Sequence, residues 1–194
     1  MPSAIRDIDA APDRGDRVVV HLADLLVAIA VFGVVSSGLF TVLQESLRVY
    51  TIGAARAESQ QSARVALERL TGEIRTAGLG PRSATFPAIS VAESSHIVLH
   101  HDLDANGIVA GAGETIAWRL VGATLRRDAG AGAQPVVDGV KRFALEYLDA
   151  SDRAVAAADE VRTVVITLVT EAAWELADRS ITTTFTTRVR LRNR

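Results

Sequence analysis

Residues Leu25 to Gln44 read LLVAIAVFGVVSSGLFTVLQ and carry no charge, and Asp24 stands directly before them. About 20 apolar residues at a rise of 1.5 Å each are enough to cross the hydrocarbon core of a membrane. Residues 1–19 form a leader-like segment, but the apolar run is longer than the core of a secretory signal and no small-residue cleavage pattern follows it. We therefore expect one retained transmembrane helix over residues 25–44.

The helix is expected to continue beyond the apolar run. From Val20 to Ala77 the sequence contains no proline and is dominated by helix-forming residues, which predicts one helix over residues 20–77. Its second half is amphipathic, with apolar residues spaced as on one helical face: Ala63, Ala66, Leu67, Leu70, Ile74 and Ala77. The sequence Gly78-Leu79-Gly80-Pro81 is typical of a helix end.

After Pro81 the pattern changes to the alternation that is typical of strands. Strands are expected over 95–100, over a hairpin of 115–120 and 124–127, and over 140–148, 161–170 and 181–191. Residues 129–133 and 154–159 are expected to be loops, and a helical turn is an alternative for the second segment. One long helix followed by a run of strands predicts an α+β fold, in which a β-rich head domain of residues 78–194 packs an antiparallel sheet on the amphipathic half of the helix.

The composition limits the possible functions. The 194 residues carry a formal net charge of −2, so nothing favours binding to nucleic acid. There are no cysteines, which excludes disulfides, thiol nucleophiles and cysteine-based zinc sites. Arginines stand on both sides of the apolar run, so the positive-inside rule gives no orientation. We find no catalytic arrangement of serine, histidine and acidic residues and no phosphate loop, and we expect neither an enzyme nor a cofactor.

Two features of the sequence each have two possible interpretations. Gly33 and Ser37 lie four residues apart in the apolar run, a spacing that favours close helix packing, although the run could also be a plain anchor. Asp102, Asp104 and Asn106 match the start of a calcium loop, but its twelfth position is Gly113 and Glu114 comes one residue late. A tight Asn-Gly turn explains the same residues without a metal.

Three histidines stand close to this turn. On a strand, His96 and His100 would share a face while His101 points to the other side. A metal-binding or pH-sensing role is one interpretation, and exposed strand histidines are the simpler one. The aromatic residues Trp118, Trp174, Phe143 and Tyr147 are expected to fill the core between the helix and the sheet.

Several segments resemble one protein family. The sequence Asp24–Ala30, DLLVAIA, resembles the ELLVAIA signature that opens type IV pilins and type II secretion pseudopilins. Ser62–Leu70 (SARVALERL) followed by Glu73–Gly78 (EIRTAG) resembles a stretch of PilW-type minor pilins and of J-type minor pseudopilins. Four later segments resemble the sheet of these proteins in the same order: Ile116–Leu120, Thr124–Arg127, Val140–Asp149 and Thr187–Asn193.

The resemblance implies a pilin-like fold and a minor pilin that helps to start a type IV pilus-like filament, or alternatively a type II secretion minor pseudopilin. Its partners would be other pilin or pseudopilin subunits, the bacterial inner membrane and prepilin peptidase, with the head outside the cytoplasm. Asp24 would pair with the amino terminus of a neighbouring subunit, whereas the residues alone also allow it to be simply a charge at the headgroup boundary of the membrane. Peptidase cleavage would fall between Val19 and Val20, where valine replaces the usual glycine. A third alternative is therefore an anchored extracytoplasmic binding domain that is never cleaved and never polymerises.

Overall fold

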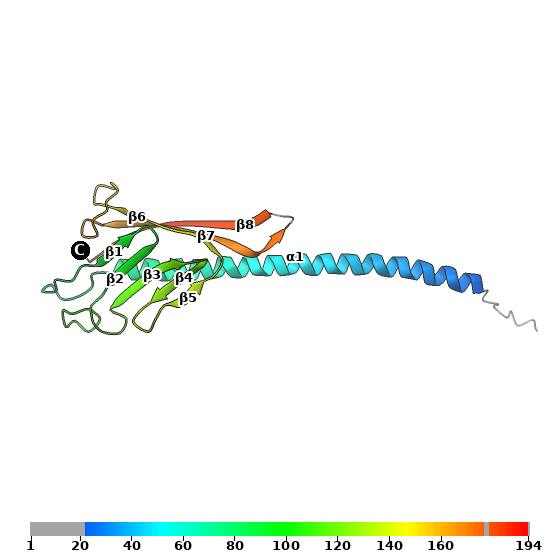
Figure 1. The fold of residues 1–194 in the computed structure, drawn as a ribbon, viewed down its shortest axis with the longest axis horizontal. Helices are drawn as coiled ribbons and strands as arrows, with labels where there is room; N and C mark the ends of the chain where they lie inside the picture. The colour runs from blue at the N-terminus through cyan, green and yellow to red at the C-terminus, as the bar shows by residue number, and fades with distance from the viewer. Residues whose placement is uncertain (1–21, 177–178, 194) are drawn as a thin grey trace, which may run out of the picture. The chain divides into compact units, whose positions relative to one another are not determined.

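The computed structural model describes residues 22–176 and 179–193, so the leader and the Val19–Val20 bond lie outside the described residues. The chain divides into two compact units, Met1–Leu47 and Arg48–Arg194. Helix α1 (Leu22–Thr76) contributes to both units, and within the described residues eight strands follow it (Figure 1). The predicted long helix and the α+β class are therefore confirmed.

The end of α1 is set by the glycine that the sequence indicated. Gly78 has a φ of +79°, a conformation that favours glycine, and its N–H donates a hydrogen bond of 2.8 Å to the carbonyl oxygen of His100. A Cβ at this position would also collide with the carbonyl oxygen of Asn193. The chain therefore leaves the helix between the strand that carries His100 and the carboxyl-terminal segment.

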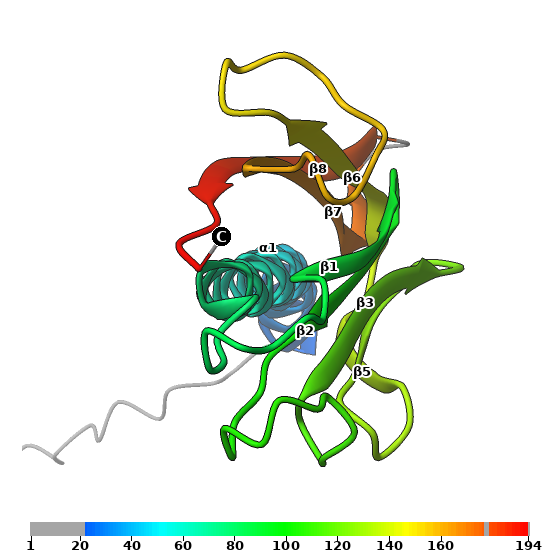
Figure 2. The same cartoon turned by 90° about the vertical axis from the view of Figure 1, so that its left-hand side faces the viewer.

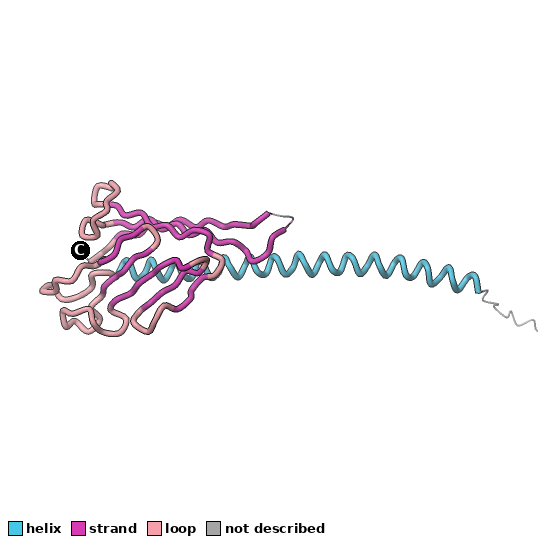
Figure 3. Tube along the Cα trace, in the orientation of Figure 1, coloured by secondary structure: helices cyan, strands magenta, loops and turns pink. Residues whose placement is uncertain are grey.

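The strands form two antiparallel sheets rather than the single sheet that we expected (Figure 3). The first sheet has five strands in the order β1-β2-β3-β4-β5: β1 (Ile89–Glu93), β2 (His96–His100), β3 (Thr115–Val121), β4 (Thr124–Asp128) and β5 (Gln134–Val137). The second has three in the order β6-β7-β8: β6 (Val140–Leu148), β7 (Thr163–Leu176) and β8 (Arg179–Arg190). The expected β3–β4 hairpin is confirmed, with Val121 opposite Thr124.

The core of the second unit lies where the amphipathic half of α1 meets both sheets (Figure 2). Leu70 and Ile74 of the helix are fully buried, and so are alternate residues of the strands, such as Ile97 and Leu99 in β2. This alternation follows from the pleat, which sends successive side chains to opposite faces. Trp118, Phe143 and Tyr147 are buried as expected, whereas the side chain of Trp174 lies outside the described residues.

Candidate functional site

The first unit presents an apolar helical surface. From Leu22 to Leu47 every residue is exposed apart from Ser36, which is partly buried. By length and composition this helix fits a transmembrane helix and is compatible with a single-pass anchor. Asp24 lies in its first turn, where the positive end of the helix dipole favours an anion.

Gly33 and Ser37 lie on one exposed face of this segment, as their spacing requires. A Cβ added at Gly33 would meet no atom within 4 Å, so the surface there is open. The hydroxyl of Ser37 donates a hydrogen bond of 2.9 Å to the carbonyl oxygen of Val34. This bond satisfies the hydroxyl donor of Ser37 within the helix. The face therefore carries two small residues, and Ser37 has no unpaired donor that would hinder the packing of another helix.

In the second unit, the Glu73 carboxylate joins α1 to the five-stranded sheet. Its Oε2 accepts a hydrogen bond of 2.6 Å from Trp118 Nε1, and its Oε1 accepts one of 2.8 Å from Arg127 Nε. Arg69, one helical turn earlier, donates a weaker bond of 3.3 Å to the same Oε1. The side chains of Glu73 and Arg127 are only 14% and 16% exposed, so this ion pair is largely withdrawn from water. Sequence periodicity placed Glu73 off the apolar face and gave no signal of this role.

The histidines lie in three different environments. His101 is 4% exposed, which corrects the expectation of exposed strand histidines. Its Nε2 lies 2.9 Å from the hydroxyl oxygen of Thr76 and 3.1 Å from the carbonyl oxygen of Glu73. His100 contacts Thr115 through Nδ1 and Ser90 through Nε2, and burial, with a smaller contribution from His101, lowers the pKa of His100. His96 lies 3.5 Å from the carboxylate of Glu93.

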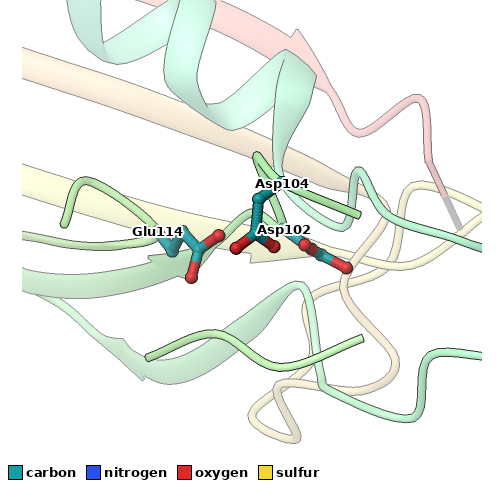
Figure 4. Close-up of side chains that lie close together, drawn as sticks. All are labelled: Asp102, Asp104 and Glu114. Carbon is teal, nitrogen blue, oxygen red and sulfur yellow. The ribbon is translucent and has the colours of Figure 1, made fainter. Parts of the chain in front are cut away.

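The loop between β2 and β3 gathers three carboxylates that could hold a metal ion (Figure 4). One oxygen from each of Asp102, Asp104 and Glu114 lies within 4.8 Å of the others, and Asp102 and Glu114 are 3% and 2% exposed. The calcium-loop spacing placed the last ligand position at Gly113, but it is the carboxylate of Glu114 that lies beside the two aspartates (Figure 4).

The same carboxylates also hold the loop by themselves. Asp102 accepts hydrogen bonds from the backbone N–H groups of Asn106 and Gly107, and Glu114 accepts them from Leu103 and Gly111. Asn106 donates its side-chain amide to Asp104 and accepts the N–H of Ile108. These bonds give every member of the cluster a structural role, so the turn and the calcium interpretations both fit this geometry.

A comparison with models of known protein families found no match, and a comparison with curated proteins found none either.

Proposed function

We propose that this chain is a minor pilin, most similar to the PilW type, that helps to start or assemble a type IV pilus-like filament. The observation that carries the proposal is the division of α1: an uncharged, exposed segment with Asp24 in its first turn, followed by a segment buried against antiparallel sheets. The first segment would stay in the bacterial inner membrane before assembly, and the head would lie outside the cytoplasm. The proposed role is structural and involves no catalysis.

In this role, Asp24 would pair with the amino terminus of a neighbouring subunit, and the face that carries Gly33 and Ser37 would pack against neighbouring helices. A carboxylate in an apolar helix raises the free energy of insertion into lipid, so a positively charged partner group would stabilise it there. The exposed surface around Gly33 supports close approach of another helix. Both contacts would form when the subunit enters a filament.

Immunodetection of the protein in filaments sheared from cells, combined with a clean deletion of its gene, tests this proposal. We expect the protein in the sheared fraction and a loss or reduction of filaments in the deletion strain. Expression of the full chain from a second locus should restore them. Normal filaments in the deletion strain, with the protein absent from the sheared fraction, would overturn the proposal. A loss of secretion with intact pili would instead assign the chain to a type II secretion filament as a minor pseudopilin.

Val19 favours a second candidate function, an anchored extracytoplasmic binding domain that does not polymerise. Valine stands where prepilin peptidase substrates carry glycine, and an uncleaved leader would block entry into a filament. Detection of the intact Met1 terminus on all of the membrane-bound protein would support this candidate, whereas a mature terminus at Val20 would reject it.

A further inference from the structure

The outer edge of β8 has no backbone partner within the described residues. Strand β8 is the last strand in the order of its sheet and pairs with β7 alone (Figure 2). In an antiparallel sheet, the N–H and C=O groups of every second residue point away from the paired neighbour. None of the other backbone hydrogen bonds of the described chain reaches residues 182–190, so these groups are left open along the edge.

The other three edges of the two described sheets are protected against strand addition. Strand β1 has five residues and an irregular register at Ser90, and β5 has four residues and contains Pro135. The outer edge of β6 is covered in part, because the N–H of Leu145 donates a hydrogen bond of 2.8 Å to the carbonyl oxygen of Ser94. Short length, bulges, proline and cover are the usual ways in which proteins protect sheet edges.

Strand β8 has none of these protective features. Its 12 residues contain no proline or glycine, and residues 180–187, SITTTFTT, carry no charge. Its register with β7 is unbroken from Thr182 to Arg190. The side chains of Thr182, Thr184 and Thr186 are exposed, so the surface beside the edge is open to solvent. A long, uncharged edge rich in β-branched residues favours pairing with an extended segment of another chain.

The charges at the end of this edge favour an acidic group on the incoming segment. Arg188 is exposed and forms an ion pair with Asp152. Arg190 lies two residues further along the same face, is also exposed, and has no hydrogen bond or ion pair among the described residues. A carboxylate opposite Arg190 would therefore complement its charge. A second copy of β8 does not supply that carboxylate, because all its charged residues are arginines.

We propose that the outer edge of β8 binds an extended segment of a different protein, which adds a strand to the second sheet. The segment would run antiparallel to β8, with uncharged residues opposite residues 182–187 and a carboxylate opposite Arg190. Its backbone would supply the affinity, and its carboxylate would fix its direction and register. This contact goes beyond the proposed function, because it does not depend on whether the partner belongs to a filament.

The test uses the isotope-labelled full chain in detergent micelles, with the acetylated and amidated peptide EVTVTVTVT as the probe. An antiparallel alignment places the glutamate of this peptide opposite Arg190 and its last threonine opposite Thr182. We expect saturable shifts in the NMR signals of the backbone amides between these two residues. Hydrogen exchange should slow by at least about tenfold at every second one of these amides. No saturable shift, or shifts without a change in exchange, would overturn the proposal.

Two N-methylated forms of the probe separate backbone pairing from other kinds of binding. One form is methylated at its valines and the other at its internal threonines. Because successive N–H groups of a strand point to opposite sides, the methyl groups of one form face β8 and those of the other face away. The first of these should lose binding, and the second should bind as the unmodified probe does. Equal binding of the two forms, or loss of binding in both, would overturn the proposal.

Proline variants of the protein test the edge itself. Thr186→Pro and Thr187→Pro each remove one N–H, and these two groups point to opposite sides of β8. The variant that removes the outward N–H should stay folded and lose binding, since an edge strand tolerates proline there. The signal of the buried Trp118 indole N–H reports whether each variant is folded. Thr186→Ser is the matched control and should leave binding unchanged. Binding of the probe by folded forms of both proline variants would overturn the proposal.

The charged end of the edge has its own test. Arg190→Gln should weaken binding of the probe about threefold, as expected for an exposed ion pair, and a probe with glutamine in place of glutamate should remove this difference. Arg142→Gln, at an exposed position of β6, is the control and should leave binding unchanged. Equal binding of the probe by the Arg190→Gln variant and the parent chain would overturn the proposed register. Without the probe, shifts of the β8 amide signals that depend on protein concentration would assign the edge to a second copy and overturn the proposal.

Discussion

The indole Nε1 of Trp118 donates a hydrogen bond of 2.6 Å to Oε2 of Glu73, and this bond connects the third strand of the first sheet to the last turns of α1. Trp118 is fully buried, so its N–H has no access to water and requires an acceptor within the protein. The Arg127 guanidinium, 2.8 Å from the other carboxylate oxygen, balances the charge of Glu73. The contacts of Glu73 with Trp118 and Arg127 therefore hold α1 in one orientation about its own axis against the first sheet.

Removing this acceptor should destabilise the head. In a fragment that begins at Arg48, where the second unit starts, Glu73→Ala leaves the Trp118 N–H and the Arg127 guanidinium without their partner. We expect a loss of about 2–3 kcal/mol in the free energy of unfolding, measured with urea. Glu68→Ala, an exposed position on the same helix, is the control and should change the value by less than about 0.5 kcal/mol. Equal stability of the two variants would contradict this role of Glu73.

The apolar face of the helix can be tested in the same fragment. Leu70 is fully buried, so Leu70→Asp would place an unpaired charge in the core and should cost more than about 4 kcal/mol. We expect the variant to lose its cooperative thermal transition by circular dichroism. Val65→Asp is the matched control, because Val65 is 51% exposed, and it should keep that transition. A folded Leu70→Asp variant would show that this face is not part of the core.

The stability of the head should depend on pH through His100. Burial, followed by the effect of His101, lowers the pKa of this imidazole in the folded state, so the unfolded chain takes up the proton first as the pH falls. The stabilising effect of neutral His100 is therefore complete above a pH of about 6.5 and decreases as the pH falls through that value. Urea unfolding on both sides of this pH should show the loss, and His100→Gln should reduce it.

His96→Gln is the control for this pH dependence. His96→Gln replaces a histidine at the other end of β2 and keeps His100 in place, so the loss of stability below pH about 6.5 should persist. A variant without His100 that shows the same pH dependence as the parent chain would assign the effect to other groups.

Processing of the leader should depend on the residue at position 19. If prepilin peptidase acts on this chain, Val19 carries a branched side chain where the enzyme usually meets glycine, and we expect poor or no cleavage of the native sequence. Val19→Gly should increase cleavage, measured by mass spectrometry of the amino terminus. Val18→Gly is the control, because it changes a neighbouring valine and leaves the scissile position as it is. A native protein that begins at a methylated Val20 would contradict the expected effect of Val19.

Asp24 should matter for assembly and not for membrane insertion. Asp24→Ala removes a charge from the start of an apolar helix, which makes partitioning into the membrane easier and should leave the membrane-bound amount unchanged or higher. Incorporation into sheared filaments should fall. Asp24→Glu retains the charge with a longer reach and should be incorporated at least as well as the parent chain. Equal incorporation of the alanine variant would remove the case for a pairing role.

Local sequence patterns were sufficient to predict the helix and most of the strands. The limits of β6 agree with the predicted strand, because Phe143, Leu145 and Tyr147 alternate with more exposed residues along it. Strands β1 and β5 were not predicted. Each is short and stands at an edge of the first sheet, and Pro135 within β5 weakens the strand signal, although an edge strand tolerates proline. Their formation depends on the neighbouring strands that pair with them.

The candidate sites were likewise predicted from the sequence only in part. The sequence pointed to Asp102, Asp104 and Asn106, but the position of Glu114 depends on how the chain turns between Asn106 and the start of β3. The strand that ends at Arg190 was predicted, but its place at an open edge of the second sheet was not. The neighbours of a strand depend on how the whole chain pairs, and the alternation of its own residues does not indicate them.

The sequence by itself determined the apolar segment after Asp24, the amphipathic face around Leu70 and the end of the helix at Gly78, because charge, periodicity and backbone preference act over a few neighbouring residues. The tertiary structure alone decided the division into two sheets and the pairing of Glu73 with Trp118, which lies 45 residues further along the chain. Contacts between residues so far apart in the sequence form because buried polar groups need hydrogen-bond partners once the core has formed. No local sequence pattern indicates which partner each group will find.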